Sequence, residues 1–196
     1  MIRFLTALAL SLVLTIALAL KIPASASAER ADPDLRRLLQ HPGVHAIMRH
    51  ALAPGTGDPA GFQVRDCRTQ RNLDDRGRTQ AAATGEKLRS LGAGFDAVRT
   101  SQWCRCKDTA DLLALGPVVE DPVLDSFFED RSTATAQTDA LRAFLADLPP
   151  DRRVMLVTHQ VNITALTGRA ISSGEVFLIR HTESRVEVLG RLLVAP

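Results

Sequence analysis

The sequence lacks internal repeats and, after residue 28, low-complexity stretches, so nothing in it indicates a repeat array. It also lacks a net charge once residues 1–28 are set aside. Arg3 and Lys21 belong to that segment, which leaves 24 − 2 = 22 basic residues against 22 acidic ones. A neutral domain is a poor candidate for nonspecific nucleic-acid binding, and we expect no nucleic-acid partner.

Cysteine is scarce, with only Cys67, Cys104 and Cys106 in the chain. A Cys-x-Cys pair with one distant cysteine is not a convincing zinc pattern. Cys104 and Cys106 are too close together to pair comfortably with each other. In an exported domain we expect Cys67 to bridge to one of them, with Cys104 favoured, and three reduced thiols are the alternative.

The first 28 residues have the layout of a secretory signal peptide. A basic start, residues 1–3, precedes an uninterrupted run of apolar, Ser and Thr residues at 4–20, and Ala26-Ser27-Ala28 forms a small-x-small cleavage pattern. An uncleaved anchor is the alternative, since the run is near the lower limit for a bilayer span. We expect a signal at 1–28 and one periplasmic or secreted domain at 29–196, without stable membrane insertion after cleavage.

Apolar runs and helical patterns alternate along the domain, which predicts an α/β fold. Strands alternating with helices form a mostly parallel sheet covered on both faces, and ligands bind beyond the carboxyl ends of its strands. The expected strands are 44–48, 95–98, 117–119, 154–157 and a closing hairpin of 175–179 and 185–194; the expected helices are 32–40, 74–91, 102–115, 135–148 and 162–166.

Histidines and arginines follow the expected strands where those strands end. Arg49-His50 comes directly after the first strand and His159 after the apolar strand 154–157, while Arg105 lies one helical turn beyond Ser101. Arginine can clamp phosphoryl oxygens with forked, charge-assisted hydrogen bonds, and a neutral imidazole can attack phosphorus. The pattern predicts phosphoryl transfer through a phosphohistidine, with no metal and no cofactor.

Four segments resemble, in order, motifs of the histidine phosphatase superfamily. Met48-Arg49-His50-Ala51 resembles its Arg-His-Gly signature, and residues 72–81 resemble the start of its "Leu-Thr-x-x-Gly-x-x-Gln-Ala" helix. Residues 101–110 are similar to its "Ser-x-x-x-Arg-Ala-x-x-Thr-Ala" segment, and residues 157–162 to its second-histidine strand end. The resemblance covers residues 44–180 and implies a three-layer α/β/α fold of the phosphoglycerate mutase type.

The resemblance implies His50 as the nucleophile, with Arg49, Arg105 and His159 completing the phosphate pocket. Two departures stand out. Ala51 replaces the usual glycine, and Ser126 stands where the family has its acidic Glu. We expect Glu129 to be the general acid, with Asp125 and Asp130 as alternatives, and Arg71 to reach the phosphate or the rest of the substrate.

These residues predict an exported phosphomonoesterase that acts on a small phosphorylated substrate. The family includes a phosphatase of lipopolysaccharide-core heptose phosphate, which this chain resembles in length and signal, so a sugar phosphate or another envelope component is favoured. A phosphohistidine protein phosphatase and a noncatalytic phosphate-binding module are alternatives. A metal site of His45, His50 and His159 is disfavoured because it lacks a known ligand spacing, and the oligomeric state stays open.

Overall fold

A computed structural model describes residues 33–183 and 185–196 of the chain and contains a six-stranded sheet. The spatial order of the strands is β3-β2-β4-β1-β5-β6. Strands β1 to β4 pair in parallel, whereas β5 is antiparallel to β1 and forms an antiparallel hairpin with β6. The strands are β1 (His45–Arg49), β2 (Ala97–Thr100), β3 (Val118–Glu120), β4 (Val154–Thr158), β5 (Glu175–His181) and β6 (Val186–Leu193).

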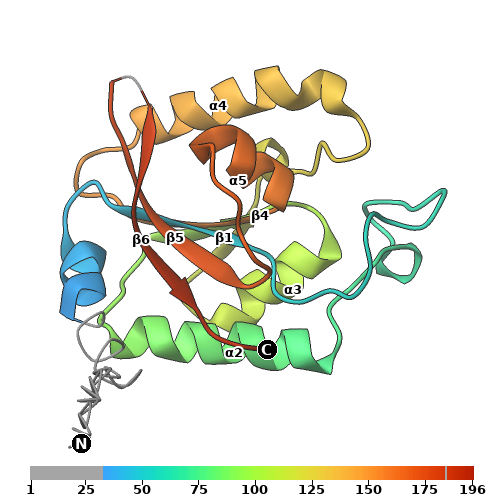
Figure 1. The fold of residues 1–196 in the computed structure, drawn as a ribbon, viewed down its shortest axis with the longest axis horizontal. Coiled ribbons are helices and arrows are strands. Elements are labelled where there is room, and N and C mark those ends of the chain that lie inside the picture. Colours follow the sequence, from blue (N-terminus) through green and yellow to red (C-terminus); the bar gives the residue numbers. More distant parts are fainter. Residues whose placement is uncertain (1–32, 184) are drawn as a thin grey trace, which may run out of the picture.

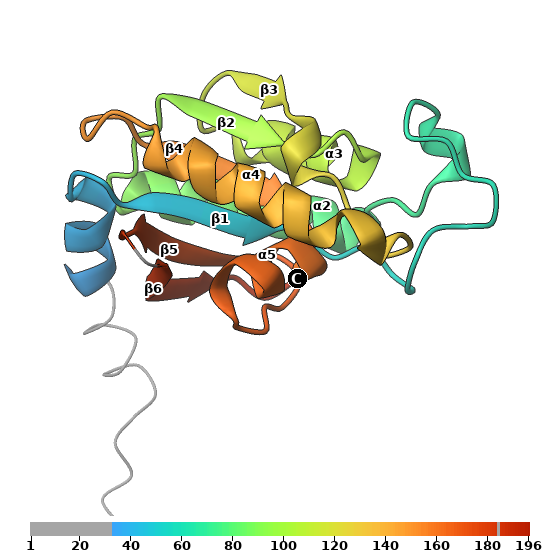
Figure 2. The ribbon, with the colours of Figure 1, turned by 90° about the horizontal axis from the view of Figure 1, so that it is seen from above.

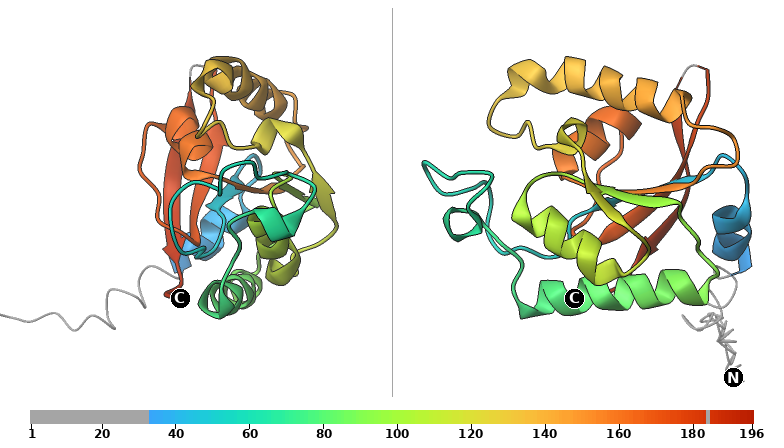
Figure 3. Two further views of the ribbon diagram at one scale, coloured as in Figure 1. Left: turned by 90° about the vertical axis from the view of Figure 1, so that its right-hand side faces the viewer. Right: turned by 180° about the vertical axis from the view of Figure 1, so that it is seen from behind.

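Helices cover both faces of this sheet, which confirms the predicted three-layer α/β/α architecture (Figure 1). The view from behind shows these helices on the two sides of the sheet as well (Figure 3). Residues 33–40 form a further helix at the start of the described chain. The four labelled helices are α2 (Asp75–Ser90) and α3 (Cys104–Leu113) on one face, and α4 (Ala134–Ala146) and α5 (Gln160–Thr167) on the other.

Alternating side chains of the central strands build two cores. Met48 of β1 packs with Leu88 of α2 and Leu113 of α3, whereas its neighbour Ile47 packs with Leu141 of α4 and Ile163 of α5. Successive residues of a strand point to opposite faces, so one strand supplies both cores. The fully buried strand β4, at the centre of the sheet, therefore reads as an uninterrupted apolar run.

Several element boundaries differ from those that the sequence predicts. Strand β2 begins at Ala97, later than expected, and continues past the apolar residue Val98 to Thr100. It extends this far because Thr100 pairs with Val157 in the parallel ladder to β4. Helix α3 begins at Cys104, since its N-cap Trp103 has extended backbone. Helix α5 begins at Gln160, directly after His159, rather than at 162. The transition from β4 to α5 is thus tighter than the sequence suggests, whereas the transition from β2 to α3 keeps its length and lies two residues later in the chain.

The expected signal peptide, residues 1–28, lies outside the described residues. In the part of the chain that the structure does describe, no helix has the length and apolar character needed to cross a bilayer.

Candidate active site

The carboxyl ends of the parallel strands meet at one edge of the sheet, and a cavity of about 370 Å³ opens there. Backbone bonds continue the ladder just past the strands, from His50 N to Thr158 O (2.9 Å) and from Ser101 N to Val157 O (3.0 Å). The His50 and His159 rings are 5.5 Å apart between centroids. Seven candidate site residues named from the sequence line the cavity: Arg49, His50, Arg71, Arg105, Glu129, Asp130 and His159.

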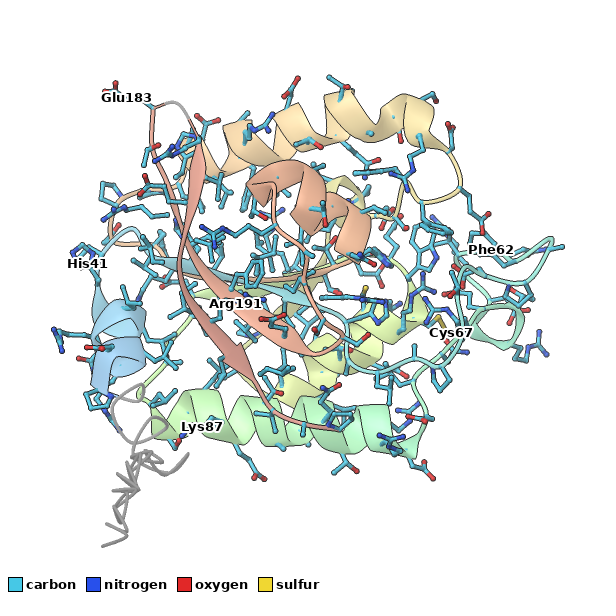
Figure 4. All side chains as sticks on the ribbon, in the orientation of Figure 1. His41, Phe62, Cys67, Lys87, Glu183 and Arg191 are labelled. Atoms are coloured by element: carbon cyan, nitrogen blue, oxygen red, sulfur yellow. A yellow bond between two sulfur atoms is a disulfide. The ribbon has the colours of Figure 1, made fainter. Side chains whose placement is uncertain are left out.

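A long loop, residues 53–74, closes one side of this cavity. It projects past the sheet edge (Figure 2) and carries the labelled side chains of Phe62 and Cys67 (Figure 4). The disulfide between Cys67 and Cys104 ties the loop to the first residue of α3. Phe62 in turn stacks at an angle on Trp103, with ring centroids 5.7 Å apart. The loop is therefore held against the start of α3, where Arg105 lies.

His50 is held as the tautomer that a nucleophile needs. Its Nδ1 lies 2.8 Å from the carbonyl oxygen of Ala51. Because a carbonyl only accepts, Nδ1 carries the proton and Nε2 keeps its lone pair. Burial, reinforced by the nearby Arg105, holds the pKa of His50 well below its usual value. The ring is neutral at physiological pH, and its Nε2 is available for attack on phosphorus.

Arg49 and Arg105 supply the positive charge beside His50. Arg49 donates through Nη1 to the carbonyl oxygen of Ile171 (3.3 Å), and Arg105 binds the Asp58 carboxylate through Nη1 and Nη2. Among the residues that the structure describes, neither Nε atom has a hydrogen-bond partner although both are buried. Buried donors without partners are costly, so an anion with acceptor oxygens is the group that would satisfy them.

His159 belongs to a hydrogen-bonded chain that runs away from the cavity. Its Nε2 is 2.9 Å from Ser101 Oγ, and that hydroxyl donates to Asp125 Oδ1 at 3.0 Å. Because the Ser101 proton goes to Asp125, Ser101 accepts from His159, and Nε2 carries the proton. Nδ1 then keeps its lone pair and faces Arg105 Nη2 at 3.5 Å. Burial, with His50 and Arg105 nearby, lowers the pKa of His159 well below its usual value.

The Gly77-x-x-Gln80 pattern at the start of α2 supports the backbone beside the nucleophile. A Cβ on Gly77 would lie 1.9 Å from the carbonyl oxygen of Leu52, so the helix approaches this backbone more closely than any side chain allows. Gln80 Oε1 accepts from Leu52 N at 2.9 Å. Ala51 N donates to Thr109 Oγ1 of α3 at 3.0 Å. Two helices therefore fix the two residues after His50.

The three carboxylates considered for the general acid have different positions. Glu129 and Asp130 line the cavity with exposed side chains, and Asp130 also accepts from Ser132 N and Ser132 Oγ. Asp125 is not a cavity-lining residue, since it lies behind Ser101 and accepts from Gln102 N at 2.7 Å. Ser126 does line the cavity. Of these three candidates, Glu129 and Asp130 are therefore the carboxylates that a leaving group in the cavity can reach.

Arg71 lines the cavity but also holds the loop in place. Its Nε donates to Gly57 O at 2.7 Å and its Nη1 to Ala53 O. Burial, with Arg105 nearby, lowers the pKa of its guanidinium. A substrate-binding role for Arg71 stays a prediction, beside the structural one that these bonds show.

Asp58 is a cavity residue that the sequence reading missed. Its side chain is 5% exposed, and it binds Arg105 at 2.7 Å. The only sequence signal for it was one carboxylate in a Gly- and Pro-rich loop that follows the nucleophile. Such loops often carry acidic residues for turn chemistry alone, which is why this signal is weak.

Neither the thiol of Cys106 nor a cluster of metal ligands adds a reactive group to the cavity in the part of the chain that the structure describes. Burial raises the pKa of the Cys106 thiol to about 12, so the thiol stays protonated, and it lies 3.7 Å from the Thr158 carbonyl oxygen. Across residues 33–183 and 185–196, no cluster of three or more His, Cys, Asp or Glu side chains could hold a metal ion. His45 is buried within β1, and its ring is not part of the cavity lining.

Comparison with known proteins agrees with this geometry. Residues 46–128 match the sequence profile of the histidine phosphatase superfamily (branch 1). A segment of 52 residues is 44% identical to the mitochondrial serine/threonine-protein phosphatase Pgam5 of Drosophila virilis, covering 26% of this chain. That segment spans only 18% of the Drosophila protein's length.

Solved structures show the same fold. The protein histidine phosphatase SixA, determined with tungstate, superposes with a TM-score of 0.54 at 16% identity, over 76% of this chain and 96% of that one. Mycobacterial glucosyl-3-phosphoglycerate phosphatase superposes with a TM-score of 0.52 at 18% identity, over 78% and 97%. Residues 46–128 thus match the histidine phosphatase superfamily, and the chain shares the fold of these solved phosphatases.

Proposed function

We propose that the chain is a phosphomonoesterase that transfers a phosphoryl group to His50 and then to water. One observation carries this proposal: His50 is fixed as the neutral Nδ1–H tautomer beside two buried arginine Nε donors that have no partner among the described residues. A neutral imidazole with a free Nε2 is a nucleophile, and preorganised donors stabilise the charge that develops on the phosphoryl oxygens.

The proposed reaction has two displacements. In the first, Nε2 of His50 forms a bond to phosphorus while the bond to the leaving oxygen breaks, and that oxygen takes a proton from Glu129 or Asp130. In the second, the same carboxylate removes a proton from water as the water oxygen bonds to phosphorus, and the N–P bond breaks to release phosphate. His159 takes up a proton at Nδ1 when the anion enters and donates it in a hydrogen bond to a phosphoryl oxygen.

A sugar phosphate is the substrate class that we favour. Aromatic side chains of Phe62, Trp103 and Phe128 line the cavity beside the cationic pocket. Aromatic faces can pack against the apolar faces of a sugar ring while the arginines bind the phosphate. Phosphohistidine in a protein is the alternative substrate, and a panel of sugar phosphates and phosphohistidine peptides separates the two.

We further propose that the protein acts outside the cytoplasm. The apolar start with its Ala26-Ser27-Ala28 pattern supports this. The bond between Cys67 and Cys104 supports it as well, because disulfides persist in oxidising compartments. Fractionation of expressing cells, with N-terminal sequencing of the exported protein, tests both the compartment and the cleavage after Ala28.

A noncatalytic phosphate-binding module is the second candidate, and Ser126 favours it. Ser126 lines the cavity where the family has its acidic Glu, and a hydroxyl is a poor proton donor to a leaving group. Such a module would be stabilised thermally by inorganic phosphate without hydrolysing any ester.

Hydrolysis of p-nitrophenyl phosphate in the presence of EDTA tests the proposal. We expect wild type to turn over and His50→Ala to lose at least ~10³-fold in kcat, because the covalent step has no substitute. His41→Ala is the matched control, since His41 is exposed and distant from the cavity lining. An acid-labile phosphoryl group on wild type but not on His50→Ala would identify the intermediate. Turnover by His50→Ala at the wild-type rate would refute the proposal.

A further inference from the structure

Asp58 is a buried carboxylate in the candidate active site for which the proposed reaction has no step. It lies on the loop that follows β1, and its side chain is 5% exposed while that of Arg105 is 3% exposed. A buried carboxylate is tolerated only when paired and hydrogen-bonded. The hydrogen-bond donors to Asp58 therefore indicate which groups this carboxylate positions.

All four of its donors come from residues around the cavity. Arg105 donates through Nη1 to Oδ1 (2.7 Å) and through Nη2 to Oδ2 (3.0 Å), which makes a forked ion pair. Trp103 Nε1 donates to Oδ2 at 3.0 Å, and Arg71 N donates to Oδ1 at 3.0 Å. Each carboxylate oxygen thus accepts two bonds, and Asp58 is fixed in position from three sides.

The fork decides which edge of Arg105 faces the cavity. A guanidinium has an end edge, formed by its two Nη atoms, and a side edge, formed by Nε and Nη2. Asp58 occupies the end edge. The Nε atom of the side edge has no partner in the described chain, and Nη2 lies 3.5 Å from Nδ1 of His159. An anion between the two histidines would meet this side edge.

The chemistry of the carboxylate also fits a holding role rather than a proton-donating one. Although burial opposes it, hydrogen bonds from Arg105 and from Arg71 N lower the pKa of Asp58. A carboxylate that stays ionised has no proton to give to a leaving group at neutral pH. It does offset the charge of one of the three arginines that line the cavity, Arg49, Arg71 and Arg105.

We propose that Asp58 is a positioning residue: its carboxylate binds the end edge of Arg105 and so presents the side edge to the phosphoryl group. This role rests on the proposed function. The direction in which anion affinity changes when the charge of Asp58 is removed separates this positioning role from simple charge balance. Removing a negative charge would tighten anion binding if Asp58 only offset the arginines, whereas it would weaken anion binding if Asp58 orients Arg105.

The experiment compares Asp58→Asn with Asp66→Asn in the full chain. Asp66 is a matched control, because it lies on the same loop and also makes a forked ion pair, with Arg68, but in an exposed position. We measure the inhibition constant of inorganic phosphate, and kcat/KM for p-nitrophenyl phosphate and an alkyl phosphate. For Asp58→Asn we expect phosphate to inhibit at least ~10-fold more weakly and kcat/KM to fall ~10²-fold or more, comparable to losing one oxyanion donor.

Two outcomes would overturn this role. Tighter phosphate inhibition by Asp58→Asn would mean that Asp58 acts through charge alone. A much larger loss on the alkyl phosphate than on p-nitrophenyl phosphate would mean that Asp58 is the proton donor, since the poorer leaving group needs the proton more.

Further measurements keep the test decisive if folding or turnover fails. If Asp58→Asn does not fold, we compare the double variant Asp58→Asn/Arg105→Lys with the single variant Arg105→Lys. We expect these two variants to bind phosphate within ~3-fold of each other, because lysine has no fork for Asp58 to orient. If wild type hydrolyses nothing, the proposed function fails, but phosphate-dependent thermal stabilisation still reports on Asp58. Equal stabilisation of wild type and Asp58→Asn would then overturn the role.

Discussion

The disulfide between Cys67 and Cys104 stabilises the fold by an amount that its place in the chain allows us to work out. It closes a loop with a sequence separation of 37, which in the chain-entropy treatment corresponds to about 3.8 kcal/mol at 25 °C. That amount is a large fraction of the stability of a domain of this size. Replacing the exposed Cys67 by serine removes the cross-link at a position where the side chain itself buries little.

We therefore expect Cys67→Ser to lower the free energy of unfolding by about 4 kcal/mol, which moves the urea midpoint down by about 2 M for a slope near 2 kcal/mol per M. The cross-link acts mainly on the unfolded chain. The folded loop is also held by Arg71 and by Asp58, so kcat/KM of the folded variant should stay within about 3-fold of wild type.

Urea unfolding followed by circular dichroism, paired with activity before unfolding begins, measures both effects. Reducing agent should reproduce the loss of stability in wild type and leave Cys67→Ser unchanged. If activity disappears while the midpoint does not move, the disulfide acts on the folded loop and the entropic reasoning is wrong.

Three further predictions concern the support of the site. Asp125→Asn should lower kcat/KM by ~10-fold or more, because Ser101 then loses the charged acceptor that directs its lone pair to His159; an unchanged value in steady-state kinetics would show that the chain of hydrogen bonds does not matter. Gly77→Ala should destabilise the fold by at least ~2 kcal/mol in chemical denaturation, since its Cβ would overlap the Leu52 carbonyl oxygen, whereas Gly94→Ala, whose Cβ would meet only Arg153 Nη2 at 3.7 Å, is the control without a clash. Stability should fall as the pH drops below about 6.5, because the lowered pKa values of His50 and His159 leave the unfolded chain with more bound protons. The loss should reach ~1.4 kcal/mol per histidine at pH 5.5, and His50→Gln should remove about half of it in thermal melts recorded against pH.

The layered fold was predictable because its signals are local. A buried central strand such as β4 is an apolar run whatever surrounds it, and the alternation of such runs with helical patterns determines the order of layers. The ends of elements were less predictable. Thr100 belongs to β2 only because Val157 offers it a partner, and that pairing depends on residues more than fifty positions away.

The site was partly predictable for the same reason. His50 and His159 follow apolar strands directly, so strand ends reveal them. Asp58 is different, because its partners Trp103 and Arg105 come from a distant part of the chain and its own loop has no periodic pattern. The position of Asp125 behind Ser101 is likewise a product of tertiary packing, and spacing alone left Asp125 as an alternative to Glu129 for the general acid.

Gln80 gives the site an order of assembly. Its amide accepts from Leu52 beside the nucleophile and donates to the carbonyl oxygens of Ser173 and Val194. The backbone next to His50 is therefore anchored through a side chain that also binds a residue just past β6. During synthesis, the strand that carries the nucleophile emerges well before Ser173 and Val194, which bind the amide of Gln80. The full set of bonds that Gln80 makes beside His50 therefore forms only after β6 has been made.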